Sequence, residues 1–200
     1  DAQESRGLGD VYKRQGTTLR QLLDISGGMR QGHELKFFTP GGSSTPILTK
    51  DDIDLPLDYE GMAGAKTMLG TKALQCFDET TSVVRVTLRW LEFYKHESCG
   101  KCTPCREGTW WVVQMLRRIE AGEGQEGDVD KLMDIADNIG GRSFCALADG
   151  AVGCLRGAIG HFRDEFEAGC RGIPAWQYLP YERSSIFNDA DRRVLEGAGA

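Results

Sequence analysis

Residues 97–106 read ESCGKCTPCR and decide how the chain must fold, because Cys99, Cys102 and Cys105 stand at equal spacing within them. A fourth cysteine, Cys145, follows much later in the sequence. Three thiolates at this spacing can converge on one metal centre, and a remote fourth can complete the coordination once the chain folds back. The pattern therefore predicts that a loop carrying Cys145 returns to the turn at residues 97–106.

The spacing C-x2-C-x2-C with a distant fourth cysteine is typical of a [4Fe–4S] cluster held by four thiolates. Structural zinc sites usually combine two separated ligand pairs, so zinc is the alternative metal. Disulfides are the third interpretation, although seven cysteines would leave one thiol unpaired. From spacing alone, Cys154 stays open as the fourth ligand in place of Cys145. We expect Cys154 in the core, Cys76 within a strand and Cys170 in a loose tail.

Positive charge and backbone amides are expected near the three clustered cysteines. Gly100 allows a tight turn between ligands, and the amides near residues 103–104 would present the positive end of a helix dipole to the cluster. Lys101, Arg106 and Arg142 would add positive charge, which stabilises a reduced cluster and raises its potential. The alternative for each of these three side chains is a solvated surface position.

From residue 80 onward, apolar residues recur at helical spacing and predict four amphipathic helices. The first presents one apolar face through Val83, Leu88 and Leu91. The expected N-terminal caps of the other three helices are Thr103, Asp128 and Asp149. Short loops join the helices, so residues 80–168 are expected to form a helical bundle that binds the cluster. Residues 169–200 are expected to be an irregular tail.

Residues 16–79 predict a small α+β module. Thr17 is the expected cap of a helix that ends at Gly27. Strands are expected at residues 35–39, 46–49 and 73–77, with a proline-broken loop at 51–58 between the last two. Residues 1–15 show neither helical nor strand periodicity, and we expect a non-native or disordered tail there. The whole chain is thus expected to be α+β.

Composition excludes several function classes. The net charge of −6 and the lack of a basic stripe speak against nucleic-acid binding. No apolar stretch is long enough to insert into a membrane, and no signal peptide is visible, so we expect a reducing cytoplasm. The three histidines are scattered, and no nucleophile–base pair can be assembled from them. No catalytic residue is therefore assigned.

Residues 97–109 resemble the cluster motif of the flavoprotein F-subunit family of NADH-quinone oxidoreductase, respiratory complex I. Residues 143–147 (SFCAL) resemble the family segment that carries the fourth ligand, and residues 161–166 (HFRDEF) resemble the end of its last bundle helix. Residues 40–46 resemble part of its small β-grasp (SLBB-like) module. The resemblance covers about residues 16–168 and implies Cys145 as fourth ligand. Ala148 and Cys154 depart from the family pattern.

The resemblance implies that the full-length protein passes hydride from NADH to FMN and then single electrons through the cluster towards quinone. NADH and FMN would bind a glycine-rich N-terminal domain that precedes residue 16, so this chain, as a C-terminal fragment, is expected to lack NADH dehydrogenase activity by itself. Neighbouring iron–sulfur subunits are the expected partners, on the inner face of the plasma membrane and peripheral to it. The alternatives are a diaphorase subunit of an NAD-reducing hydrogenase or formate dehydrogenase, and a zinc-stabilised structural module.

Overall fold

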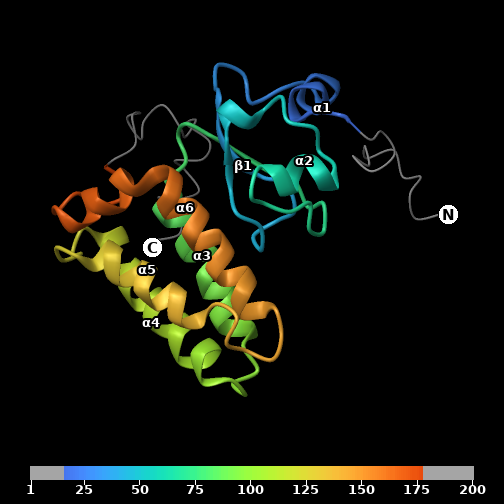
Figure 1. Ribbon diagram of the computed structural model, residues 1–200. Coiled ribbons are helices and arrows are strands. Elements are labelled where there is room, and N and C mark those ends of the chain that lie inside the picture. Colours follow the sequence, from blue (N-terminus) through green and yellow to red (C-terminus); the bar gives the residue numbers. More distant parts are fainter. Residues whose placement is uncertain (1–15, 178–200) are drawn as a thin grey trace, which may run out of the picture.

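Strands give way to helices near residue 80, as the change in sequence periodicity predicts. The computed structural model describes residues 16–177, in which a three-stranded antiparallel sheet with two short α-helices precedes four longer helices (Figure 1). We call residues 16–82 the sheet module and residues 83–170 the helical bundle. The expected α+β class is confirmed at this level. The predictions for residues 1–15 and 178–200 lie outside the described residues.

The central strand of the sheet separates two hydrophobic cores. The strands are β1 (Leu35–Thr39), β2 (Leu48–Thr49) and β3 (Gln75–Asp78). β1 lies in the middle and pairs antiparallel with both others. Because successive side chains of a strand point to opposite faces, Phe38 packs in a core within the sheet module while Phe37 joins the core of the helical bundle. Both rings are fully buried, so β1 fastens the two parts together.

Two short helices belong to the sheet module, and side-chain caps fix where they begin. They are α1 (Leu19–Ser26) and α2 (Tyr59–Gly64). Thr18 caps α1 by accepting a hydrogen bond from the Gln21 amide, so the prediction of Thr17 as the cap is wrong by one residue. Asp58 caps α2 by accepting from the Gly61 amide at 2.7 Å. The sequence did not predict α2, because so short a segment shows no helical periodicity.

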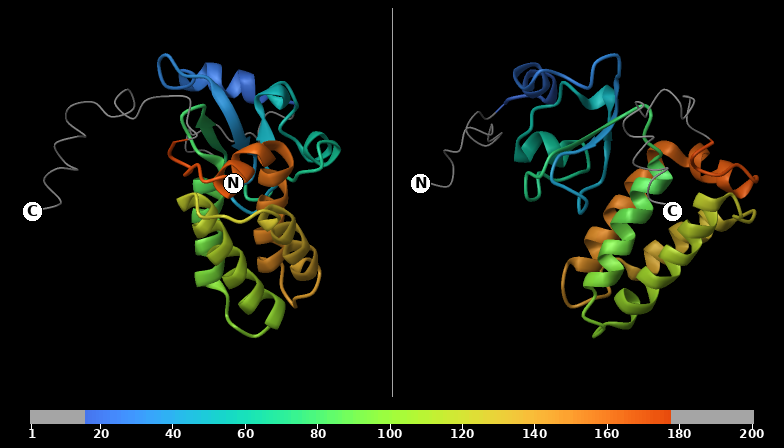
Figure 2. Two further views of the ribbon diagram at one scale, coloured as in Figure 1. Left: turned by 90° about the vertical axis from the view of Figure 1, so that its left-hand side faces the viewer. Right: turned by 180° about the vertical axis from the view of Figure 1, so that it is seen from behind.

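The helical bundle contains the four helices that the sequence predicts. They are α3 (Val83–Glu97), α4 (Thr103–Ala121), α5 (Asp128–Ile139) and α6 (Leu147–Cys170). α3 packs against α4 and α6, and α5 packs against the same two helices, so the four lie alongside one another (Figure 2). Leu88 and Leu91 of α3 and Phe166 of α6 are buried, as their spacing predicts. α6 continues to Cys170, beyond the bundle end expected at residue 168.

The starts of three helices differ from the sequence expectation. Thr103 is the first residue of α4 and Cys102 is its N-cap. Asp128 is likewise the first residue of α5 and is fully buried, instead of lying outside as a cap. Asp149 lies inside the first turn of α6, and its carboxylate accepts a hydrogen bond from the Gly141 amide at 2.7 Å. The carboxylate of Asp149 therefore orders the preceding loop and does not cap its own helix.

A part-buried ion pair and packed aromatic rings join the sheet module to the helical bundle. The Lys36 ammonium donates a hydrogen bond to the Glu165 carboxylate, which also accepts from the Val83 amide at 3.2 Å. The rings of Phe37 and Phe162 lie with their centroids 5.7 Å apart. The backbone of α6 is non-helical at Phe162, so the helix kinks where it meets the sheet.

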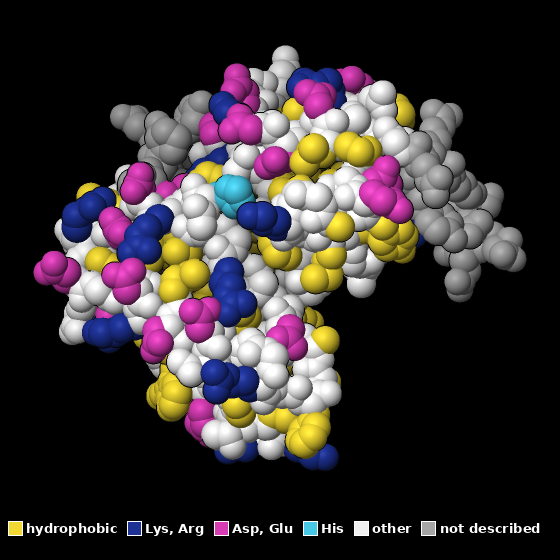
Figure 3. Space-filling view, viewed as in Figure 1, with side chains coloured by type: hydrophobic (Ala, Val, Ile, Leu, Met, Phe, Trp, Pro, Cys, Tyr) yellow, Lys and Arg dark blue, Asp and Glu magenta, His cyan; other side chains and the backbone are white. Residues whose placement is uncertain are grey.

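Charges of both signs are interspersed over the face of the molecule drawn in Figure 3, and no continuous basic stripe crosses the coloured, described part of that face. None of the helices between residues 16 and 177 combines the length and the apolar character that a membrane crossing requires. The face drawn in Figure 3 therefore has the mixed charge of an ordinary exposed protein surface.

Candidate metal centre

Residues 98–105, which comprise the turn after α3 and the first residues of α4, carry three cysteines at one end of the helical bundle (Figure 1). We refer to this segment as the turn. Gly100 lets the chain reverse there, because its φ of +79° lies in the left-handed region that glycine adopts without strain. Cys105 lies in the first turn of α4 and is buried, whereas Cys102 is half-buried and Cys99 is exposed. The three side chains thus range from the bundle core to the solvent.

The loop before α6 folds back onto this turn, as the remote fourth cysteine predicts. The Phe144 backbone N–H donates a hydrogen bond to Cys102 Sγ at 3.4 Å. Lys101 Nζ lies 5.3 Å from the centre of the Phe144 ring, a cation–π distance. Cys145 is the next residue along the chain, and its side chain is exposed. Tertiary folding therefore brings the segment of Cys145 to the turn that holds the other three cysteines.

A serine hydroxyl also lies beside a sulfur atom of the turn. Ser98 Oγ is 3.2 Å from Cys105 Sγ, and the Gly100 amide donates to the same Ser98 oxygen at 3.4 Å. Sequence reasoning missed both Ser98 and Phe144. Each of them directly precedes one of the four predicted ligand cysteines, and that position in the sequence could have identified them.

Of the basic side chains expected near the cysteines, Arg106 is engaged in other contacts and Arg142 is exposed to solvent. Arg106 donates one hydrogen bond to the Gly100 carbonyl and another to the Glu107 carboxylate at 2.8 Å. Glu107 offsets part of the Arg106 charge, and both side chains are largely exposed. Arg142 is exposed in the loop before α6. The positive charge around the turn is therefore partly neutralised and screened by solvent.

The three remaining cysteines occupy different surroundings. Cys154 is fully buried in α6, where its thiol donates to the Ala151 carbonyl at 3.1 Å and where burial raises its pKa to about 12. Burial raises the pKa of the Cys76 thiol in β3 to about 11. Cys170 ends α6 and does not lie in a loose tail, and burial raises its pKa as well. In all three, burial disfavours the thiolate, which is the form that binds a metal.

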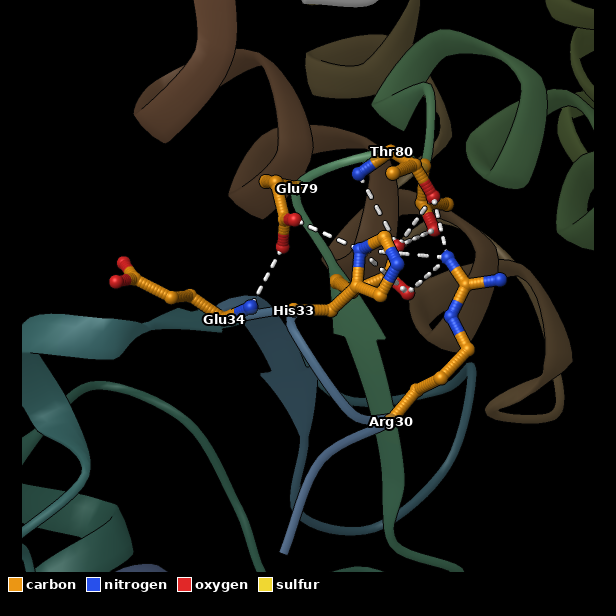
Figure 4. A network of polar contacts seen from close by, with 7 residues as sticks. Arg30, His33, Glu34, Glu79 and Thr80 are labelled. Atoms are coloured by element: carbon orange, nitrogen blue, oxygen red, sulfur yellow. Dashed lines mark hydrogen bonds and ion pairs between the residues drawn. The ribbon is translucent and has the colours of Figure 1, made fainter. Parts of the chain in front are cut away.

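A second group of potential ligand atoms lies in the sheet module, where Figure 4 shows it. His33, Asp78 and Glu79 place one ligand atom each within 4.8 Å of one another. His33 Nδ1 lies 2.8 Å from the Glu79 carboxylate, whose other oxygen accepts from the Glu34 amide at 2.8 Å. Arg30 donates to the Asp78 carboxylate at 3.1 Å.

This polar group has the character of a structural clamp. The Arg30 guanidinium already supplies the positive charge that a metal ion would bring, and backbone amides saturate the carboxylates further. The clamp ties the chain before β1 to the end of β3, directly before α3 begins. Sequence reasoning left His33 without a role, because its partners lie far along the chain.

Comparison with known proteins gives a consistent result. Residues 85–169 match the family model described as the NADH-ubiquinone oxidoreductase-F iron-sulfur binding region. The F subunit of NADH-quinone oxidoreductase of Streptomyces coelicolor is 65% identical over 185 residues, which is 90% of this chain and 41% of that protein. The Escherichia coli protein of the same name is 45% identical over 183 residues, which is 90% of this chain and 40% of that protein. The chain thus spans well under half the length of these relatives.

A solved structure shows a similar fold. A crystal structure of an NAD+-reducing [NiFe]-hydrogenase in the H2-reduced state matches with a TM-score of 0.67 and 26% sequence identity. The match covers 91% of this chain and 30% of the hydrogenase chain. The arrangement of sheet module and helical bundle therefore also occurs in a protein with a different name and lower sequence identity.

Proposed function

Because this chain belongs to the F-subunit family of NADH-quinone oxidoreductase and contains its iron–sulfur binding region, we propose that it relays single electrons through a [4Fe–4S] cluster. In this proposal the thiolates of Cys99, Cys102, Cys105 and Cys145 hold the iron. Such a cluster, when bound, stores and releases one electron at a time. In this proposal the described residues contribute the ligands and the surroundings of the cluster.

One observation carries the proposal: the Phe144 amide donates to Cys102 Sγ at 3.4 Å. Because the Phe144 amide contacts Cys102 Sγ, the next residue, Cys145, lies close enough to the turn to bind the same cluster. The chemistry of the donor set also fits iron, since all seven cysteines are free thiols. Cys154 is an unsuitable fourth ligand, because its sulfur is buried in α6 and bonded to the Ala151 carbonyl.

The surroundings of the turn suit an anionic cluster. Cys102 is the N-cap of α4, so Cys102 and Cys105 lie at the N-terminal end of the helix, where the helix dipole is positive. Gly100 reverses the chain between two ligands. The bundle core behind Cys105 excludes water from one side of the site. These features stabilise added negative charge and limit reorganisation when the charge changes.

The function of the whole protein is part of the proposal. Electrons reach the cluster from FMN, which NADH reduces in a part of the protein outside this chain, and they leave towards quinone. This chain alone then lacks NADH dehydrogenase activity. Its partners are neighbouring iron–sulfur subunits of complex I, on the inner face of the plasma membrane. The names of its relatives and the matched region support this placement.

The sheet module supports a finer structural proposal, a β-grasp (SLBB-like) unit. A small sheet whose central strand is β1, with α1 and α2 as its helices, is compatible with that architecture. The module would then place the end of β3 so that α3 starts at a fixed position. Its role in this proposal is to support the helical bundle.

Metal analysis of the full chain, purified without oxygen, tests the function. We expect about four iron and four acid-labile sulfide per chain and a reduced-cluster signal in low-temperature EPR after dithionite treatment. Replacing the remote ligand, Cys145→Ser, should abolish or change that signal. The matched control is Cys154→Ser, which removes a thiol from the core and should leave the signal unchanged.

The possible results separate the alternatives. Zinc without sulfide would overturn the redox function and leave a zinc-stabilised structural module. A normal EPR signal in Cys145→Ser together with a lost signal in Cys154→Ser would show that the buried Cys154, and not Cys145, is the fourth ligand. Absence of NADH oxidation by the isolated chain, with activity in the full-length protein, would support the division of labour between the two parts.

A second candidate function is the diaphorase subunit of an NAD-reducing hydrogenase, or of a formate dehydrogenase. The structural match to an NAD+-reducing hydrogenase favours it, at 26% identity. The 65% identity to part of a quinone oxidoreductase supports the first proposal more strongly. The genes that flank the coding sequence decide between them, because quinone-oxidoreductase subunits are expected there and hydrogenase subunits would contradict the first proposal.

A further inference from the structure

The end of α3 places a hydroxyl group against the most buried cysteine of the turn. Ser98 is the C-cap of α3, and its Oγ lies 3.2 Å from Cys105 Sγ in the first turn of α4. Cys105 is only 7% exposed, so little water competes for its sulfur. In such surroundings a hydrogen bond is stronger than it is in water.

The direction of this hydrogen bond follows from the donors around it. The Gly100 amide can only donate, and its acceptor is Ser98 Oγ at 3.4 Å. The serine hydroxyl therefore accepts one bond and keeps its own proton to donate. A cysteine that binds iron is a thiolate with no proton, so its sulfur can only accept. The chain of bonds must then run from the Gly100 amide through the Ser98 hydroxyl to Cys105 Sγ.

We propose that Ser98 is a positioning residue that raises the reduction potential of the cluster by donating a hydrogen bond to the Cys105 thiolate. The inference rests on the proposed function, because it requires Cys105 to be an iron ligand. Reduction adds negative charge to the cluster and its sulfur ligands. A donor aimed at a ligand sulfur stabilises that charge, and hydrogen bonds to the sulfurs are among the factors that set such potentials.

Ser98 is the suitable place to test this effect by substitution. The other hydrogen bond to a sulfur of the turn, from Phe144 to Cys102, comes from the backbone and survives any change of side chain. Ser98 donates through its side chain, so Ser98→Ala removes the bond and Ser98→Thr retains the hydroxyl. Thr109 provides the control: its buried hydroxyl donates to the Cys105 carbonyl at 2.7 Å and to no sulfur.

The experiment is an EPR-monitored redox titration of the full chain and of three variants. Iron and sulfide contents are measured first, so a missing cluster is separated from a shifted potential. Ser98→Ala should retain the cluster and be about tenfold harder to reduce at a given potential, a decrease of about 59 mV for one electron. Ser98→Thr and Thr109→Val should both have the same midpoint reduction potential as the unsubstituted chain.

Each outcome bears on the proposal. An unchanged potential in a fully loaded Ser98→Ala variant overturns it, and so does an equal decrease in Thr109→Val. If Ser98→Ala fails to hold iron while Ser98→Thr is normal, the hydroxyl is needed to retain the cluster, and the proposed role in setting its potential is overturned. If both Ser98 variants lose iron, the space at this position matters and the hydroxyl does not, which overturns the proposal. A chain without any cluster in its unsubstituted form refutes the proposed function itself.

Discussion

The two ends of the helical bundle are built in opposite ways. At the start of α3, the sheet module covers the bundle with the part-buried pair of Lys36 and Glu165 and with packed aromatic rings. At the end of α3, Cys99, Cys145 and the Phe144 ring are exposed, the last by 89%. The first end is completed by the protein's own side chains. The second presents sulfur atoms and an aromatic ring that the described chain leaves uncovered.

This difference suggests that the sheet end of the bundle determines stability and that the cysteine end determines the proposed redox behaviour. A buried charge is tolerated only when it is paired and hydrogen-bonded, and the sheet end meets that requirement for Glu165. At the cysteine end Cys99 and Cys145 are exposed, so the order of these two side chains depends on the turn, the returning loop and the proposed cluster. We therefore expect substitutions at the sheet end to change the free energy of unfolding, and substitutions at the cysteine end to change redox behaviour.

The largest expected effect comes from breaking the part-buried pair. Glu165→Ala removes the carboxylate partner of Lys36, whose side chain is 16% exposed and keeps a hydrogen bond to the Thr81 carbonyl. We therefore expect the free energy of unfolding to fall by about 3 kcal/mol, the lower end of the range for a broken buried pair. Urea unfolding followed by circular dichroism measures it. The matched control is Glu167→Ala, two residues further along α6, which removes a half-exposed ion pair with Arg163 and should cost less than about 1 kcal/mol. Equal losses in both variants would contradict the contrast.

A smaller effect is expected where α6 approaches the sheet module. A Cβ at Gly157 would lie 2.8 Å from the Ile47 backbone nitrogen, so Gly157→Ala forces backbone atoms apart and should cost about 1–3 kcal/mol. Gly160 lies nearly one turn further along α6, where an added Cβ would meet nothing within 4 Å, and Gly160→Ala should stabilise the helix by about 0.5–1 kcal/mol. Thermal unfolding distinguishes the two signs. A stabilising Gly157→Ala would show that the junction is looser than these contacts indicate.

The smallest effect on stability is expected at the cysteine end. Phe144→Ala removes an exposed ring that contacts Lys101, and the free energy of unfolding should change by less than about 0.5 kcal/mol. Iron content should also be unchanged, because the backbone N–H that donates to Cys102 remains. A loss of more than about 2 kcal/mol would mean that this end is held by side-chain packing, and would remove the contrast between the two ends.

Local sequence patterns predicted which helices exist better than they predicted the residue at which each helix begins. Apolar spacing identified all four bundle helices, since it reports the face that each helix buries. The cap assignments were wrong at Thr103, where α4 begins one residue earlier than predicted, and at Asp128 and Asp149, whose carboxylates bond to other partners. Asp149, for example, bonds to the loop at Gly141. α2 was missed because its six residues are too few to show a period.

The sequence by itself determined the chemistry of the candidate centre and the class of the fold. Cysteine spacing and helical periodicity are short-range properties, and both can be read directly from neighbouring residues. Only the tertiary structure decided which distant groups meet: the Phe144 amide with Cys102, Lys36 with Glu165, and His33 with Glu79. Such contacts depend on how the helices and the sheet pack against one another. The packing energy is shared among many residues that lie far apart in the sequence, so no short-range pattern predicts it.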